Sequence, residues 1–258
     1  MTLERVDVEN CEDRLQVALH RARYDFVLGR LRPGERLLEV GVGSGTFTRE
    51  LLPQCDSYKG VEYDPAACLT ARQKSGGKAE IVEGDARCLP FGENEFSFIV
   101  CLEVLEHLGD FRAGVRSLHK CLRPDGVAVI SVPYRRVGGP SKINEHHPYE
   151  PGEQELVSLL RELFARVEVY YQYFEETWTM RIARRLHLLR VLGLVHHYAD
   201  LVAGLPQATS RLRLGPKAKG MKMGLTVVIH GKKQALAPQP SPVGPGGERL
   251  VESSRLTE

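Results

Sequence analysis

The chain has 258 residues, enough for one large domain whose core needs no disulfide or metal support. Apolar residues make up 42% and charged residues 26%, which excludes a wholly disordered chain, a collagen and a membrane bundle. The formal net charge of +2 gives no overall attraction to nucleic acid or to anionic membranes. The six cysteines form no C-x-x-C pair, so we expect small core residues rather than zinc ligands or disulfides. The acidic start contains no apolar run, and we expect a cytoplasmic protein.

Strands and helices alternate through the first half of the sequence. The hydrophobic pattern predicts, in chain order, helix 15–31, strand 36–42, a helix from residue 47, strand 57–63, helix 65–74, strand 78–85, strand 96–104, helix 111–122 and strand 126–134. Alternation at this interval is typical of a parallel sheet covered by helices on both faces.

The second half is less regular. Residues 135–152 are polar and rich in Gly and Pro, which predicts a loop. They are followed by helix 153–164, strand 165–174 and a last strand at 224–230. We expect one domain over residues 1–176 and 223–233, a helical insertion or lid over 177–222, and a disordered tail over 234–258.

A glycine-rich turn ends the first strand. Glu39 is followed by Gly41, Gly43 and Gly45, so glycine stands at alternate positions. Such a turn lets the backbone approach a ligand closely, and the following helix adds amide donors at the carboxyl edge of the sheet. The dinucleotide pattern G-x-G-x-x-G fails here because its last position holds Thr46.

Carboxylates end the next two strands. Glu62 lies 17 residues beyond Gly45, where a carboxylate can accept both hydroxyl groups of a ribose. Asp85 ends the third strand and is followed by Ala86. A carboxylate beside a backbone amide matches the donor and acceptor edge of adenine.

The succession LLEVGVGSG, GVEYDP, EGDARCLPF, FIVCLEVLEHL and LRPDGVAVISVP resembles the class I S-adenosylmethionine-dependent methyltransferases. The resemblance covers residues 15–132 and continues more weakly to 172. It implies a Rossmann-like, mostly parallel sheet of seven strands, with an antiparallel last strand, and S-adenosylmethionine as cofactor. It also implies that the three glycines cradle the methionine part, that Glu62 binds ribose, and that Asp85 and Ala86 bind adenine. Many members have Asp where this chain has Glu62.

A second resemblance lies in the first helix. His20, Arg23, Tyr24 and Phe26 are similar to an H-x-x-R-Y-x-F run of small-molecule and sugar-tailoring methyltransferases. It implies that Arg23 and Tyr24 cap the cofactor carboxylate. The cofactor-binding candidates are completed by two strand-end acids, Glu39 and Glu103.

An E-x-x-E-H run follows the fourth strand. If this segment is helical, Glu103, Glu106 and His107 share one face and, with His146 or His147, offer ligands for a divalent ion. The run resembles metal-using methyltransferases of ubiquinone biosynthesis and of small-RNA 3′ ends, yet it also occurs in metal-free members. We predict no metal. His107 and His147 are instead the catalytic candidates, because imidazole can accept a proton from a hydroxyl acceptor at neutral pH.

The predicted function is S-adenosylmethionine-dependent methylation, with an oxygen of a small molecule, sugar or lipid-linked intermediate as acceptor. One alternative is a metal-dependent RNA 2′-O-methyltransferase, which the near-neutral charge disfavours. Another is a non-catalytic cofactor-binding scaffold. The segment 177–222 has nine Lys or Arg residues against one acid, so peripheral membrane contact is open, although we favour a lid. The sequence leaves the oligomeric state open.

Overall fold

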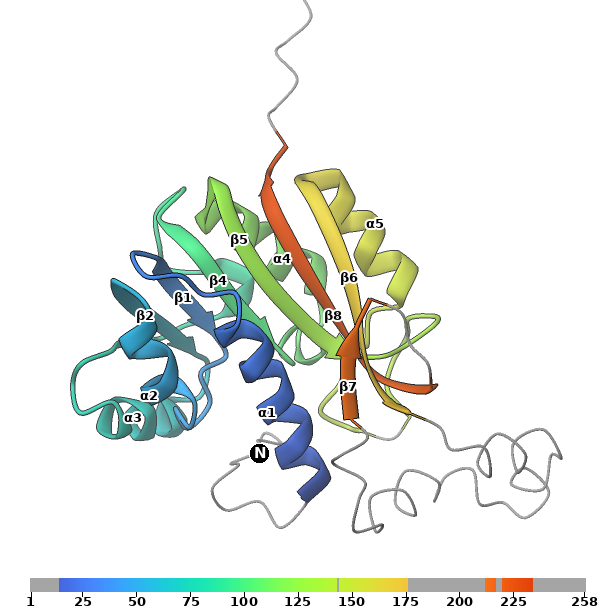
Figure 1. Ribbon diagram of the computed structural model, residues 1–258, viewed down its shortest axis with the longest axis horizontal. Coiled ribbons are helices and arrows are strands. Elements are labelled where there is room, and N and C mark those ends of the chain that lie inside the picture. The colour runs from blue at the N-terminus through green and yellow to red at the C-terminus, as the bar shows by residue number, and fades with distance from the viewer. Residues whose placement is uncertain (1–13, 143, 176–211, 217–219, 234–258) are drawn as a thin grey trace, which may run out of the picture.

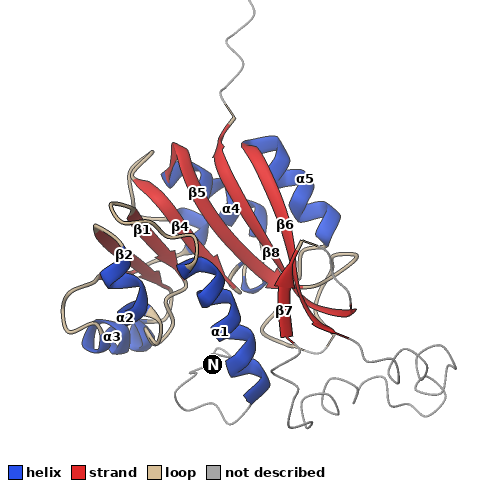
Figure 2. Cartoon of the chain, in the orientation of Figure 1, coloured by secondary structure: helices blue, strands red, loops and turns tan. Residues whose placement is uncertain are grey.

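The computed structural model of the chain describes residues 14–142, 144–175, 212–216 and 220–233, which form one sheet with helices on both faces (Figures 1 and 2). The strands are β1 (Arg36–Val40), β2 (Ser57–Glu62), β3 (Glu80–Glu83), β4 (Phe96–Leu102), β5 (Leu122–Pro133), β6 (Phe164–Glu175), β7 (Leu212–Gly215) and β8 (Gly220–Lys232). Their spatial order is β3-β2-β1-β4-β5-β8-β6-β7. The contiguous strands β3, β2, β1, β4 and β5 pair in parallel, as the alternating pattern predicts.

The helices are α1 (Arg14–Leu28), α2 (Thr48–Leu51), α3 (Pro65–Lys74), α4 (Phe111–Cys121) and α5 (Glu153–Leu163), with short 3-10 helices η1 (Leu52–Gln54), η2 (Ala86–Cys88) and η3 (Leu105–His107). Helices α1, α2 and α3 cover one face of the sheet, and α4 and α5 cover the other (Figure 1). Successive strand residues serve opposite faces, so Leu37 packs in the core under α1 to α3 and Leu38 in the core under α4 and α5. None of the helices in the described part of the chain is long and apolar enough to cross a membrane.

Side-chain caps fix where two of these helices begin. Asp64 accepts a hydrogen bond from the backbone nitrogen of Ala67 at 2.9 Å, and Pro65 occupies the first helical position of α3. Asp110 accepts from the backbone nitrogen of Ala113 at 3.0 Å at the start of α4. Helix α3 therefore begins at the residue that the sequence predicts.

Within the described residues the sheet already has eight strands, so the predicted count of seven was wrong. The additional strand, β7, pairs antiparallel with β6 at the edge of the sheet and lies in the range predicted as a helical insertion. It has only four residues, and such a short alternation of apolar and basic side chains does not stand out within a basic segment. Strand β8 also begins three residues before the predicted domain boundary at 223. Residues 176–211 and the predicted tail, 234–258, lie outside the described part of the chain.

The last strand is antiparallel, as expected. Strand β8 lies between β5 and β6 and runs opposite to both, with Pro133 paired to Gly224 and Glu168 paired to Val228. The carboxyl ends of β1 to β5 therefore meet the beginning of β8 at one edge of the sheet. Ligands of open parallel sheets bind at this edge.

Candidate functional site

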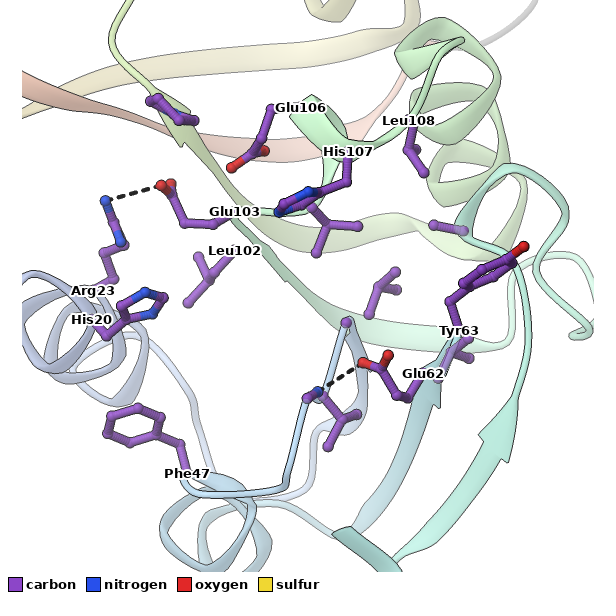
Figure 3. Close-up of a pocket in the computed structure, with 18 of the residues that line it drawn as sticks. His20, Arg23, Phe47, Glu62, Tyr63, Leu102, Glu103, Glu106, His107 and Leu108 are labelled. Carbon is purple, nitrogen blue, oxygen red and sulfur yellow. Dashed lines mark hydrogen bonds and ion pairs between the residues drawn. The ribbon is translucent and has the colours of Figure 1, made fainter. Parts of the chain in front are cut away.

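A cavity of about 500 Å³ opens at the carboxyl edge of the parallel strands (Figure 3). This volume lies within the range of small-molecule sites. Its walls come from α1, from the loops that follow β1 to β5, and from Met223 of β8. Most of the predicted site residues line it: Arg23, Tyr24, Gly41, Gly43, Glu62, Asp85, Ala86, Glu103, His107 and His147.

The three glycines of the loop after β1 all have positive φ, which disfavours other residues. A Cβ atom on Gly41 would lie 2.4 Å from Cγ2 of Val104, and one on Gly45 would lie 2.8 Å from Cα of Ala71. A Cβ atom on Gly43 would meet nothing within 4 Å. Gly41 and Gly45 thus serve close packing, and Gly45 does not line the cavity, whereas Gly43 leaves open space for a ligand.

Glu62 connects the end of β2 to the glycine loop (Figure 3). Its Oε2 accepts from the backbone nitrogen of Gly43 at 2.8 Å, and its Oε1 accepts from that of Asp64 at 2.9 Å. These two bonds hold the Glu62 carboxylate at the cavity wall, where the sequence analysis expects the ribose.

Asp85 lies at the end of β3 and is held in its charged form. Its Oδ1 accepts from the backbone nitrogen of Arg87 at 2.8 Å, and Nη2 of the Arg87 guanidinium lies 2.6 Å from Oδ2. These hydrogen bonds with Arg87 lower the pKa of Asp85 below its usual range. The site therefore presents a carboxylate at this wall, next to the buried Ala86.

Glu39 lies behind the cavity wall rather than in it, so it does not meet the prediction of direct cofactor contact. The Tyr24 hydroxyl donates to its Oε1 at 2.6 Å, and the Tyr58 hydroxyl donates to its Oε2. Burial raises the pKa of Glu39 to about 7, although the two tyrosine hydrogen bonds act in the opposite direction. Glu39 thereby joins α1, β1 and β2 and holds Tyr24, whose ring stacks on Phe47 at a centroid distance of 3.9 Å.

Arg23 and Glu103 face each other across one end of the cavity (Figure 3). Nη2 of Arg23, a residue only 4% exposed, lies 3.1 Å from Oε2 of Glu103. Among the described residues, Nε of Arg23 has no hydrogen-bond partner, so it remains able to bind a ligand carboxylate. His20 lies beside this pair, and burial, followed by the positive charge of Arg23, lowers its pKa to about 4. His20 is therefore neutral at physiological pH.

The E-x-x-E-H run is not the α-helix that would place its acids and its histidine on one face. Glu103 follows β4 with a φ of 54°, and only the 3-10 helix Leu105–His107 comes after it. Glu103 therefore faces Arg23, while Glu106 is buried. Burial, followed by the nearby Glu103 charge, raises the pKa of Glu106 well above its usual range.

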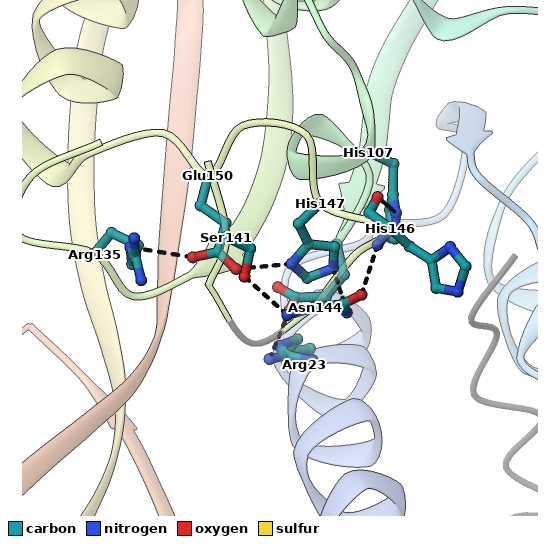
Figure 4. A network of polar contacts seen from close by, with 9 residues as sticks. Arg23, His107, Arg135, Ser141, Asn144, His146, His147 and Glu150 are labelled. Carbon is teal, nitrogen blue, oxygen red and sulfur yellow. Dashed lines mark hydrogen bonds and ion pairs between the residues drawn. The ribbon is translucent and has the colours of Figure 1, made fainter. Parts of the chain in front are cut away.

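The two histidines predicted to be catalytic lie side by side (Figure 4). Their rings are perpendicular, with centroids 4.7 Å apart, although His107 follows β4 and His147 belongs to the loop after β5. Nδ1 of His107 lies 3.1 Å from the carbonyl oxygen of His146. Nδ1 of His147 lies 2.8 Å from Oε1 of Glu150, and its Nε2 lies 3.1 Å from Nδ2 of Asn144.

Asn144 and Glu150 are site residues that the sequence analysis missed, together with Arg135, which contacts Glu150. They lie in a polar loop where acids and amides are common, and no spacing distinguishes them from solvated neighbours. The sequence feature that could have identified them is their position in the same loop as His147.

Glu106, His107 and His147 each offer one ligand atom, and these atoms lie within 4.8 Å of one another. This arrangement of two imidazoles and a carboxylate is one that divalent ions accept. Within the described residues, Oε2 of Glu106 is buried without a hydrogen-bond partner.

Comparisons with known proteins point to methyltransferases. Residues 38–130 match a protein family described as a methyltransferase domain. A Mycobacterium tuberculosis protein named as a probable S-adenosylmethionine-dependent methyltransferase is 28% identical over 165 residues, which are 62% of this chain and 57% of that relative. A ubiquinone/menaquinone biosynthesis C-methyltransferase of Coxiella burnetii is 26% identical over 178 residues, 65% of this chain and 70% of that protein.

Among solved structures, the N-methyltransferase NodS of Bradyrhizobium japonicum, in complex with S-adenosylhomocysteine, aligns with a TM-score of 0.55. The alignment covers 86% of this chain and 93% of that one at 18% identity, which supports a common fold.

Proposed function

We propose that this chain, whose fold and methyltransferase domain are those of the class I S-adenosylmethionine-dependent methyltransferases, methylates an oxygen atom of a small molecule, sugar or lipid-linked intermediate. The supporting observation is one cavity that is lined both by the glycine loop with Glu62 and Asp85 and by the adjacent rings of His107 and His147. A cofactor-binding scaffold would need only the first group of residues.

The first group fits the cofactor. The open space at Gly43, the carboxylate of Glu62 at the cavity wall and the charged Asp85 suit a backbone approach, a ribose and an adenine amino group in that order along the sheet edge. Nε of Arg23 suits the carboxylate of the methionine part. When bound, S-adenosylmethionine supplies a methyl group on a positively charged sulfur.

The second group acts on the acceptor. In this proposal Arg23, Glu62 and Asp85 orient the cofactor, and His107 and His147 form the wall where the acceptor hydroxyl lies. A hydroxyl must lose its proton as its oxygen is methylated, and a neighbouring imidazole nitrogen can accept that proton. Holding both reactants in line supplies much of the remaining rate increase.

A metal-dependent methylation, including the RNA 2′-O-methylation considered above, is the second candidate. The clustering of Glu106, His107 and His147 favours it. Nε2 of His147 contacts Nδ2 of Asn144, a hydrogen-bond donor, so an ion, like an acceptor hydroxyl, would have to displace that amide. We retain the metal-free reaction as the proposal, and the effect of EDTA decides between the two candidates.

A transfer assay tests the proposal. The purified chain is given S-adenosylmethionine with a tritiated methyl group and, separately, a phenol, a sugar glycoside, a reduced quinone and a short RNA, each with and without EDTA. We expect label in a small molecule and no effect of EDTA. Label in RNA alone, or label that appears only with an added divalent ion, would favour the second candidate.

The same assay tests the role assigned to His147. In His147→Ala, turnover should fall at least tenfold, because the acceptor loses its proton acceptor, while calorimetric affinity for S-adenosylmethionine changes less than twofold. Equal losses in turnover and affinity, or no loss, would place His147 outside the reaction centre.

A further inference from the structure

Backbone hydrogen bonds join the two sides of the loop between β5 and α5. Gly139 and Glu150 exchange two backbone hydrogen bonds, of 3.1 and 2.8 Å, and the backbone nitrogen of Glu153 donates to the carbonyl of Arg135 at 2.8 Å. These bonds fix the backbone of Glu150 close to the cavity. Its carboxylate therefore approaches the ring of His147 from a defined direction.

The hydrogen bonds of Asn144 show which nitrogen of His147 carries the proton (Figure 4). The backbone nitrogen of His146 donates to Oδ1 of Asn144 at 2.9 Å, which fixes the orientation of the amide. Nδ2 of Asn144 then faces Nε2 of His147 at 3.1 Å. An amide nitrogen can only donate, so Nε2 of His147 must accept. The proton of the neutral ring is therefore on Nδ1.

The Nδ1 proton is held by a buried acid. Nδ1 donates to Oε1 of Glu150 at 2.8 Å, and Nε of Arg135 lies 3.1 Å from Oε2 of the same carboxylate. The guanidinium of Arg135 holds one oxygen of the Glu150 carboxylate in place, while the other oxygen accepts the hydrogen bond from Nδ1 of His147. Nδ1 of His107 lies 3.1 Å from the neutral carbonyl oxygen of His146.

We propose that Glu150 is a positioning residue that, held by Arg135, fixes the tautomer of His147 and prepares its Nε2 to accept the proton. This inference rests on the proposed function, because it assigns a role within that reaction. The amide of Asn144 donates a hydrogen bond to Nε2 of His147 until the acceptor hydroxyl replaces it.

The chemistry balances with these groups alone. The O–H bond of the acceptor breaks, and its proton goes to Nε2 of His147. The oxygen electron pair forms the bond to the methyl carbon, and the electron pair of the broken C–S bond stays on sulfur. His147 becomes an imidazolium ion, and the carboxylate of Glu150 at its Nδ1 stabilises the new positive charge.

The variant Glu150→Gln reverses the tautomer. Arg135 is purely a donor, so it takes the single amide oxygen, and the amide nitrogen then faces Nδ1 of His147. A proton on Nε2 then requires the Asn144 amide to turn its oxygen toward the ring and to give up its bond with the backbone nitrogen of His146. Nitrogen-15 NMR of the full chain, with His147 assigned by loss of its signals in His147→Gln, reports which ring nitrogen is protonated. We expect a protonated Nδ1 in the wild type and in Glu150→Asp, and a bare Nδ1 in Glu150→Gln.

Turnover is measured on the acceptor that the wild type methylates in the transfer assay. Glu150→Gln should lose at least tenfold in kcat with cofactor affinity within twofold of the wild type, and Glu150→Asp should recover most of the loss. The matched control is Glu145→Gln in the same loop, where the side chain is 90% exposed and no change is expected.

Four outcomes separate the two proposals. A bare Nδ1 in wild-type His147, or wild-type turnover in Glu150→Gln, overturns the role of Glu150. Equal losses of kcat, cofactor affinity and thermal stability in both Glu150 variants overturn it as well, because they indicate a structural role alone. A protonated Nδ1 in a chain that methylates nothing in the assay supports the hydrogen-bond arrangement and contradicts the proposed function.

Discussion

At the scale of single residues, the glycines after β1 differ in what prevents their replacement. Packing against Val104 and Ala71 requires Gly41 and Gly45, whereas Gly43 has space around its Cα and is constrained by its φ of 60°. Its neighbourhood is therefore free to receive a ligand, and its backbone nitrogen is oriented by Glu62. A side chain at Gly43 would enter the volume assigned to the cofactor.

Gly43→Val should lower the affinity for S-adenosylmethionine at least tenfold, about 1.4 kcal/mol, because valine both strains the loop and fills the space. Gly34→Val is the matched control: Gly34 also has positive φ and open surroundings, but it lies outside the cavity. Calorimetry should show a loss in the first variant only. Unchanged affinity in Gly43→Val would contradict the assignment of the glycine loop to cofactor binding.

The lowered pKa of Asp85 determines how we expect cofactor binding to depend on pH. Its pKa is lowered chiefly by hydrogen bonds from Arg87, so the carboxylate, and the binding that needs it, persist as pH falls until the pH passes that lowered pKa. In Arg87→Ala the pKa returns toward its usual value, and affinity should begin to fall at a higher pH. Calorimetry from pH 7 downward measures this shift. Arg116→Ala, which removes an exposed pair with Asp110, should leave the profile unchanged, and identical profiles in all three proteins would refute the assignment.

At the scale of elements, one buried carboxyl group joins α1 to the sheet. Tyr24 of α1 and Tyr58 of β2 both donate to Glu39 of β1, and Thr48 of α2 lies 3.1 Å from the Tyr58 hydroxyl. The cavity wall formed by α1 thus depends on the protonation state of a buried group that does not itself line the cavity.

Glu39 should make stability fall as pH rises. Its folded pKa, raised to about 7 by burial, exceeds the ordinary value of 4.5, so the folded state binds the proton more tightly. The contribution of Glu39 to the free energy of unfolding is therefore fully present below pH 4.5. It declines between pH 4.5 and about pH 7, and it no longer changes above that pH. In Glu39→Gln this contribution disappears. Urea unfolding at pH 5 and pH 7 should show a smaller decrease in the variant than in the wild type, and an equal decrease would mean that another group controls it.

The elements that the sequence predicts correctly are those with local signals. Helix α3 has Asp64 and Pro65 at its start, and β4 is an apolar run buried on both faces. The glycine loop and the acids after β2 and β3 lie at strand ends, where chain order alone brings them to one edge. The four-residue β7 depends on its pairing with β6, which lies far away along the chain. The contacts of Glu150 depend on the direction of side chains in a loop. The hydrophobic periodicity of the sequence predicts neither feature.

At the scale of the whole molecule, the cavity joins two halves of the sheet. The cofactor candidates that line the cavity lie at or just after the ends of β1 to β4 or belong to α1, whereas His147 and Glu150 lie in the loop after β5. The antiparallel strands β8, β6 and β7 extend the sheet beyond β5, away from the cofactor half. This division predicts that changes beyond β6 leave cofactor binding intact.

The register of β6 and β7 allows a direct test of that division. Phe174 is paired with Leu212, and opposite residues of antiparallel strands have Cα atoms within about 5.5 Å of each other. An Asn-Gly turn can therefore replace residues 176–210 and close a hairpin without moving either strand. The shortened chain should bind S-adenosylmethionine within twofold of the wild type, by calorimetry, and unfold at a similar temperature. A tenfold weaker affinity at an unchanged unfolding temperature would show that the removed residues reach the cofactor half. A large fall in the unfolding temperature would show that the domain needs them to fold, and either result would contradict the division.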